Sequence, residues 1–403
     1  MDFQHVGYLL PFALVLLTAS SIAPNRLAPG TLTNIKYFQE VRLFLCILAL
    51  SLFVGLRGLD VGTDTRMYAA IFTRSGFGTL RENITRTTQT TGYEIFSYLI
   101  RRQTENSTVL FLTATTITVA LVLFAYWNIA PNFRWAVIGY ITLGAYAYIG
   151  NGLRQGIAIA LCLAAWTLRK RWLLASVAFA VAFSFHPSTV VFVVLFICLR
   201  KLNPSRRFLY IVTLSTFAIS MLGGYVDLTW TAVLHERFAE HALAGQQGGL
   251  GTMLNILVHL SALWATYNTA ARGNRDIQFA WVMFAFSPFF MAWGVHIVPM
   301  ARLELYFSIF LPILVSNFVA VSAISIVRKC ILLLGMLGYF AFHLISWNEM
   351  LPYGIQTQGV VGNLFLASGI ILIARVIVTR VQAYAILAPS TIERTRIESH
   401  AVA

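Results

Sequence analysis

Residues 172–199 read WLLASVAFAVAFSFHPSTVVFVVLFICL. The stretch is almost wholly apolar, and Phe185-His186-Pro187 interrupts it at its centre. Pro187 removes one helix hydrogen bond and biases His186 away from helical backbone geometry. The sequence therefore predicts two short helices with a break between them.

The basic residues on either side indicate how this stretch runs through the membrane. Arg169, Lys170 and Arg171 precede it, and Arg200 and Lys201 follow it. Lys and Arg concentrate in cytoplasmic loops. A single crossing would put one of the two groups on the wrong side, whereas a hairpin keeps both groups inside. We therefore predict a helical hairpin or re-entrant element with its tip at HPST.

The rest of the chain has the composition of a multi-pass membrane protein. Hydrophobic residues make up 58% of its 403 positions, charged residues 11%, and the mean hydropathy is +0.74. Soluble domains carry about 25% charged residues. Apolar runs long enough to cross a membrane core of roughly 30 Å fall near 6–23, 41–56, 108–129, 133–150, 153–168, 208–226, 252–271, 277–296, 303–325, 330–347 and 358–379.

These runs predict an all-α, polytopic integral membrane protein with about 11 full spans plus the Pro-broken hairpin, or about 12–13 hydrophobic segments. We expect one transmembrane domain over 1–380 and a cytoplasmic tail over 381–403. Alternation of the spans places the loop 57–107 and a smaller loop, 227–251, on the external side, which would be the periplasm of a bacterium with two membranes. The start of the chain, MDFQHVGYLL, has no Lys or Arg, so the first span is expected to be retained.

Several classes of function are disfavoured by the same composition. The net charge is +14, but the basic residues are spread among membrane-flanking loops, which argues against nucleic-acid binding. The four cysteines lie singly in apolar stretches, without the spacing of a disulfide framework or a metal site. No metal, nucleotide or other cofactor is predicted.

The first candidate site is GLRGLDVGTDTRMY, residues 55–68, at the mouth of an apolar run. Arg57 is expected to grip a phosphate, because its planar guanidinium donates two parallel hydrogen bonds and stays charged. Gly62 allows close approach of the backbone, and Asp64 could orient the arginine or bind sugar hydroxyls. The alternative is a helix end from which Arg57 reaches the lipid headgroups. After it, MYAAIF has the spacing of a short helix on the membrane surface.

Three further segments carry polar residues at the expected external side. Glu94 in TTGYEIFSYLIRR lies either in a sugar-binding cleft or on the water-facing side of an interfacial helix. Arg154 and Gln155 stand at the end of an apolar span, where a charge is costly and is usually functional or paired. Arg302 in VPMARLELYF follows the same logic, with Glu304 as its alternative partner.

His186 is the candidate general base. A lone His on an apolar face is more often a hydrogen-bonded core residue, which is the alternative. The break at Pro187 nevertheless leaves unpaired backbone, which is tolerated at membrane depth only where it lines a cavity or is buried in protein. An imidazole that titrates near neutrality can accept a proton there.

RGLDVGTDTRMY, GYEIFSYL, GLRQGIAIAL and SFHPS follow one another in the order seen in Wzy-type polysaccharide polymerases of the EpsG-like branch, and the chain resembles that family. The resemblance covers about 50–200, and RLELYF from position 302 and LPY at 351–353 fit more loosely. Phe96 stands where the family often has a glycine, so the local turn could differ. The motif residues carried over are Arg57, Gly62, Asp64, Tyr68, Glu94, Arg154 and His186.

The resemblance implies a GT-C-like membrane transferase that polymerises repeat units at the periplasmic face of the bacterial inner membrane. Donor and acceptor would be undecaprenyl-diphosphate-linked oligosaccharides, and a chain-length regulator is a conceivable protein partner besides the lipid bilayer. His186, Asp64 or Glu94 would take the acceptor's proton. Substrate or diphosphate binding would fall to Arg57, Gly62, Tyr68, Arg154, Gln155 and Arg302.

Other classes remain open at this point. A flippase or transporter of the same lipid-linked sugar would also have arginines in a cavity and a broken helix, but its charges should follow the membrane's depth. Another membrane glycosyltransferase, an O-antigen ligase or an acyltransferase of surface sugars is also compatible. A ligase should carry a large late periplasmic loop, and 227–251 is modest in size.

Overall fold

The computed structural model describes residues 33–86, 90–200, 204–222, 250–294, 298–321 and 326–346, together with Ala19. In these ranges all regular structure is helical, which confirms the predicted all-α class. The helices are α2 (Thr33–Gly55), α3 (Thr65–Arg74), α4 (Leu80–Arg86), α5 (Thr91–Arg101), α6 (Ser107–Ile129), α7 (Phe133–Thr142), α8 (Ala145–Asn151), α9 (Leu153–Thr167), α10 (Trp172–Phe185), α11 (Thr189–Leu199), α12 (Arg206–Leu222), α14 (Leu250–Ala271), α15 (Arg275–Gly294), α16 (Val298–Ser308), α17 (Leu311–Val321) and α18 (Ile326–Ser346).

The protein is membrane-embedded. Three helical stretches of the described ranges are long and apolar enough to cross a membrane, namely Ser107–Ile129, Arg275–Gly294 and Met300–Val321. α9, α10 and α11 are equally apolar but shorter. Large apolar side chains are exposed on the outer helices, as at Trp172, Ile211 and Leu334, which is the surface that lipid covers.

Most helix bounds follow the apolar runs, but α2 begins at Thr33, ahead of the predicted run 41–56, and two runs are divided where the backbone breaks. α6 and α9 match the predicted 108–129 and 153–168 within a residue. The run 133–150 is divided into α7 and α8, because Gly144 between them takes a left-handed φ of 87°. The run 303–325 is divided at 309–310, just before Pro312 in the first turn of α17.

Some predicted segments lie outside the described residues. These are the spans 6–23 and 358–379, nearly all of the loop 227–251, the LPY motif and the tail 381–403.

Residues 172–199 form the predicted hairpin. Phe179 of α10 lies 6.2 Å from Phe192 and 5.1 Å from Phe196 of α11, measured between ring centroids. In a continuous helix Phe179 and Phe196 would lie about 25 Å apart. His186 ends α10 in an extended conformation, with φ −154° and ψ 121°. The break at Pro187 therefore turns the chain back on itself.

The tip of the hairpin is fixed against α5. The Thr90 hydroxyl donates to the main-chain carbonyl of Phe185 at 2.6 Å, and the rings of Phe96 and Phe185 meet edge to face at 5.9 Å. Gly92 lies so close to Ser184 that an added Cβ would collide with it. Phe96 thus continues α5 as a helix, without a turn at that position, and packs against the residue before His186.

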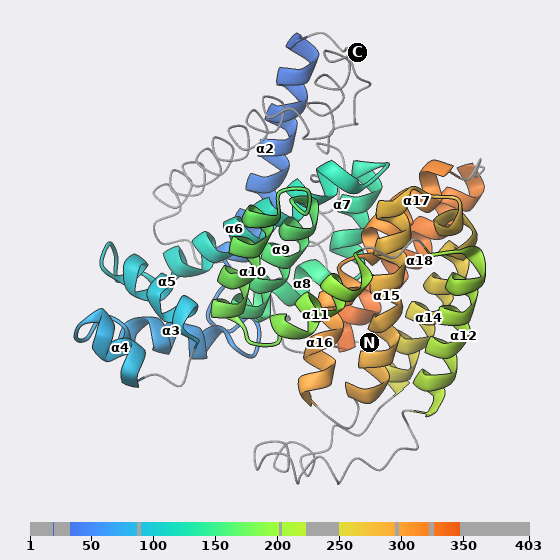
Figure 1. The fold of residues 1–403 in the computed structure, drawn as a ribbon. Coiled ribbons are helices and arrows are strands. Elements are labelled where there is room, and N and C mark those ends of the chain that lie inside the picture. Colours follow the sequence, from blue (N-terminus) through green and yellow to red (C-terminus); the bar gives the residue numbers. More distant parts are fainter. Residues whose placement is uncertain are drawn as a thin grey trace, which may run out of the picture.

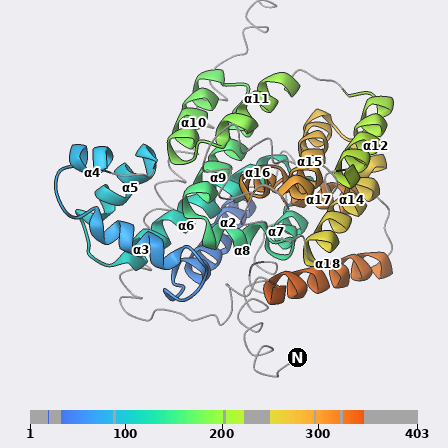
Figure 2. The same cartoon turned by 90° about the horizontal axis from the view of Figure 1, so that it is seen from below.

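The remaining helices form two groups that meet along α7 and α17. In the first group α6 packs between α2 and α9, and in the second α15 packs against α12, α14 and α16 (Figure 1). The Tyr126 hydroxyl of α6 donates to the carbonyl of Ile309 at 2.8 Å, and Gly139 of α7 lies against Pro312. α3, α4 and α5 lie together at one side of the bundle in both views (Figure 2).

Candidate functional site

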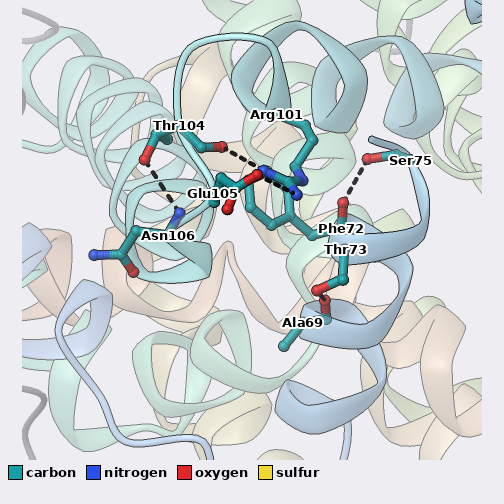
Figure 3. A network of polar contacts seen from close by, with 8 residues as sticks. All are labelled: Ala69, Phe72, Thr73, Ser75, Arg101, Thr104, Glu105 and Asn106. Atoms are coloured by element: carbon teal, nitrogen blue, oxygen red, sulfur yellow. Dashed lines mark hydrogen bonds and ion pairs between the residues drawn. The ribbon is translucent and has the colours of Figure 1, made fainter. Parts of the chain in front are cut away.

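The loop between α2 and α6 is built of short helices that Arg101 ties together. The Arg101 guanidinium lies 5.7 Å from the ring of Phe72 in α3 and donates to the Glu105 carboxylate at 3.1 Å (Figure 3). The amide of Asn106 donates to the Thr104 hydroxyl at 3.1 Å, where α6 begins. This network holds α3 and α5 in register with α6, and so positions the residues that these two helices contribute to the site.

Arg57 is fully buried, with an exposed fraction of 0%. Its Nε donates to the Thr65 hydroxyl at 3.2 Å, another guanidinium nitrogen donates to the Val54 carbonyl at 2.9 Å, and the guanidinium lies 4.7 Å from the ring of Phe111. The alternative in which Arg57 reaches the lipid headgroups is wrong. A contact between Arg57 and a diphosphate would require the turn to open, so its binding role stays a prediction.

Gly62 and Asp64 are held by Asn151 of α8. The Asn151 carboxamide oxygen accepts the amide hydrogen of Asp64 at 3.0 Å, and its nitrogen donates to the Thr63 hydroxyl at 2.7 Å. Gly62 has a left-handed φ of 84°, and an added Cβ would lie 2.8 Å from that same oxygen. A glycine is therefore needed at position 62 for the turn itself, whatever ligand approaches it.

Arg154 lies between two tyrosines that α3 and α5 contribute. Its guanidinium carbon is 5.8 Å from the ring centroids of both Tyr68 in α3 and Tyr93 in α5, and the two rings are 5.4 Å apart. Burial raises the pKa of both tyrosines, and the charge of Arg154 opposes that rise. The Nε of Arg154 is buried with no hydrogen-bond partner among the described residues.

Gln155 joins α9 to α16 beside Arg302. Its carboxamide nitrogen donates to the main-chain carbonyl of Arg302, and its oxygen accepts from the Tyr148 hydroxyl at 3.0 Å. Arg302 is exposed, and it makes no ion pair with any residue in the described ranges. Glu304 instead accepts from Ser287 at 2.7 Å and lies 3.7 Å from His259, so the alternative of an Arg302–Glu304 pair is wrong.

His186 lies in the break between α10 and α11, at the same end of the bundle. Its Nδ1 is 2.5 Å from the Ser188 hydroxyl, which in turn donates to the Tyr306 hydroxyl at 3.1 Å. Because the Ser188 hydroxyl donates its hydrogen bond to Tyr306, its oxygen accepts one from Nδ1–H of His186. Nε2 of His186 then carries the free lone pair. Burial and the positive charges of Arg154 and Arg302 lower the pKa of His186 to about 4.

Most of the predicted residues converge. Arg154 and Arg302 both act electrostatically on His186, and the Tyr148 hydroxyl lies within electrostatic reach of Arg302 and Asp64. Glu94, in the first turn of α5, is only 3% exposed, which contradicts the alternative of a water-facing carboxylate. Its part in sugar binding or proton transfer stays a prediction, as does that of Asp64.

Several residues of this site were missed from the sequence. Tyr93, Tyr148, Asn151 and Ser188 each make a polar or ring contact to a predicted residue, and Tyr306 accepts a hydrogen bond from Ser188. A usable signal existed for two of them, since Tyr148 and Asn151 are polar groups in an apolar run directly before Arg154. Among the described residues, no group of three His, Cys, Asp or Glu side chains could hold a metal ion.

Comparison with known proteins identifies the family. The model of the EpsG family matches residues 41–355, which include every residue of the site described above. No curated protein and no solved structure gives a match. The family is associated with polysaccharide biosynthesis. The match extends over more than half of the chain, and the chain therefore belongs to the EpsG family.

Proposed function

We propose that this protein is a glycosyltransferase that polymerises undecaprenyl-diphosphate-linked oligosaccharide repeat units. The reaction would take place at the periplasmic face of the bacterial inner membrane, in the synthesis of an O-antigen, a capsule or an exopolysaccharide. One observation carries the proposal. Segments far apart in the sequence bring two arginines, Arg154 and Arg302, to a single histidine, His186, at one end of the bundle.

The chemistry of this transfer matches those groups. A hydroxyl oxygen of the acceptor sugar bonds to the anomeric carbon of the donor, and the bond from that carbon to the diphosphate oxygen breaks. The diphosphate leaves with the electron pair, so negative charge develops where Arg154 and Arg302 stabilise it without a proton transfer. The hydroxyl proton goes to Nε2 of His186, which the low pKa keeps unprotonated at neutral pH.

Binding of the donor would also adjust the strength of the base. Burial and, after it, the two arginines lower the pKa of His186 in the free protein, which makes it a weak base. A diphosphate bound to the arginines would oppose the part of this lowering that their charges cause, so the pKa of His186 would rise. The base thus becomes stronger when the donor is in place.

Reconstitution with a lipid-linked repeat unit tests the proposal. Wild-type protein in proteoliposomes should yield a ladder of lipid-linked polymers. His186→Gln keeps hydrogen bonding but cannot take up the proton, and loss of a positioned base costs about 10²–10⁴ in rate. His186→Gln and His186→Ala should therefore leave single repeat units. Translocation of the lipid without any ladder would instead support a flippase, and a normal ladder from His186→Gln would make Asp64 or Glu94 the better candidate base.

A further inference from the structure

A cavity lies at the opposite end of α9 from Arg154. Its volume is about 450 Å³, and it opens where α9 and α11 end and α15 begins. Arg154 and Arg169 are separated by about 22 Å along the chain direction of α9, at 1.5 Å per residue. The cavity is therefore distinct from the candidate active site. The positive-inside rule puts this end of the bundle in the cytoplasm.

Aromatic rings form the apolar wall of this cavity. Trp166 stacks on Phe279 at 5.2 Å, and Phe196 meets Phe279 edge to face at 5.9 Å. All three side chains are buried and line the cavity. The outer surface nearby is also apolar, because Trp172 and Ile197 are exposed at the ends of the hairpin.

The rim of the cavity is positively charged. Its lining includes four basic residues and one acidic residue: Arg169, Lys170, Arg200, Arg275 and Asp276. Arg169 is paired with Asp276, and Arg275 donates to the Arg200 carbonyl at 2.9 Å. Lys170 and Arg200 are exposed, and neither forms an ion pair with a residue of the described ranges.

The ends of the helices explain why only some of these basic residues are there. The end of α9 attracts a cation, and Arg169 donates to the Trp166 carbonyl there at 3.1 Å. At the start of α15 the Asn274 side chain already accepts the amide hydrogens of Asp276 and Ile277 at 3.0 Å. An anion in the cavity would therefore meet side-chain cations, chiefly Lys170 and Arg200, rather than backbone N–H groups.

We propose that this cavity binds the phosphate headgroup of an anionic phospholipid. The phosphate would lie between Lys170 and Arg200, and the acyl chains would run along the exposed apolar side chains at the ends of α10 and α11. Basic pockets between transmembrane helices on the cytoplasmic side suit such headgroups. A free phosphate offers the same charge, but it would make no use of the aromatic wall or of the apolar surface beside it.

Lipid retention by the full-length protein tests the site. The purified protein is placed in nanodiscs of phosphatidylcholine with a minority of phosphatidylglycerol, and the lipids it keeps after extraction are counted by native mass spectrometry. Wild type should keep phosphatidylglycerol selectively. Lys170→Ala/Arg200→Ala should lower that selectivity about 10- to 30-fold, from the contribution of two basic residues. Arg328→Ala/Lys329→Ala, which changes basic residues outside the cavity, should leave it unchanged.

Three results would overturn the proposal: equal retention of both lipids by wild type, unchanged selectivity in Lys170→Ala/Arg200→Ala, or displacement of the lipid by excess inorganic phosphate. The last of these would indicate a free-phosphate site. If the double alanine variant does not fold, a photoactivatable phosphatidylglycerol decides the question on wild type. Crosslinks should map to the peptides that contain Lys170 or Arg200, and crosslinks confined to other peptides would refute the site.

Discussion

The side chain of Gln155 donates a hydrogen bond to the main-chain carbonyl of Arg302, a residue 147 positions further along the chain. This bond connects α9 with α16, so the two helices that carry the arginines facing His186 are locked together at that point.

Gln155→Glu should therefore impair donor binding more than folding. The variant still accepts from the Tyr148 hydroxyl but no longer donates to the Arg302 carbonyl, and the loss of one such hydrogen bond costs about 0.5–1.5 kcal/mol. We expect KM for the lipid-linked donor to rise by about 2- to 10-fold, and thermal stability in detergent to fall only slightly, because the Arg302 carbonyl lies inside α16 and keeps its helical hydrogen bond. An unchanged KM would show that the bond does not position Arg302.

Arg154 and Arg57 form a matched pair of substitutions that should differ in kind. Arg154→Ala should abolish chain extension with little loss of stability, because the guanidinium is partly exposed between two rings. Arg154→Lys should restore activity only in part, since lysine binds phosphate as a point charge.

Arg57→Ala should also abolish chain extension, but through the fold. It removes the side-chain donors to the Thr65 hydroxyl and the Val54 carbonyl and leaves a space beside Phe111, and it should lower stability by about 1–3 kcal/mol. The check is the thermal unfolding temperature of both variants beside their polymer ladders. A stable Arg57→Ala protein without activity would favour a direct contact of Arg57 with the diphosphate.

The pH profile should report the charges around His186. Its pKa lies near 4, below the ordinary value of 6.5, so the neutral form persists until the pH falls to about 4. Accordingly kcat/KM of the wild type should not fall as the pH is lowered through 6.5; its fall at low pH, the acid limb of the profile, should come near pH 4. Arg302→Gln removes one of the cations that lower the pKa, so its limb should move to higher pH, whereas Arg302→Lys should keep the wild-type limb. The position of the limb is the measurement, whatever the absolute rate, and identical limbs in all three proteins would contradict the assignment.

The hairpin makes a prediction about sidedness. In a variant without Cys46, Cys162, Cys198 and Cys330, single cysteines at Arg171 and Arg200 should both resist a membrane-impermeant thiol reagent added from outside. A cysteine at Glu82 in α4 should react, as a control for the external side. Reaction at position 200 but not at 171 would mean that 172–199 crosses the membrane once.

Hydropathy and charge predicted the long elements well, and the limits of the prediction have physical causes. The ends of α6 and α9 coincide with polar residues, so composition locates them. The breaks at Gly144 and at 309–310 lie between apolar neighbours, where transfer energy does not change and only backbone geometry decides.

The candidate site shows the same division. Arg154, Gln155 and His186 were found because a polar group in an apolar stretch is costly and therefore informative. The sequence around Arg57 predicts an accessible arginine, as it does for Arg154, yet Thr65 and Phe111 enclose Arg57. These contacts depend on how the turn after α2 folds back on α6. Tyr93 and Tyr306 gave no signal, because tyrosine is common at membrane interfaces and only the packing shows which hydroxyl or ring faces a functional group.

The folded-back course of 172–199 has a consequence for how the chain is counted across the bilayer. Both of its ends line one cavity, through Lys170 and Arg200, so the chain enters and leaves the element on the same side of the membrane. Deleting the element, or inserting it into a relative that lacks it, would not change the orientation of any later helix across the membrane. A histidine can thus be delivered to the far end of the bundle by a single module whose gain or loss does not invert the rest of the protein.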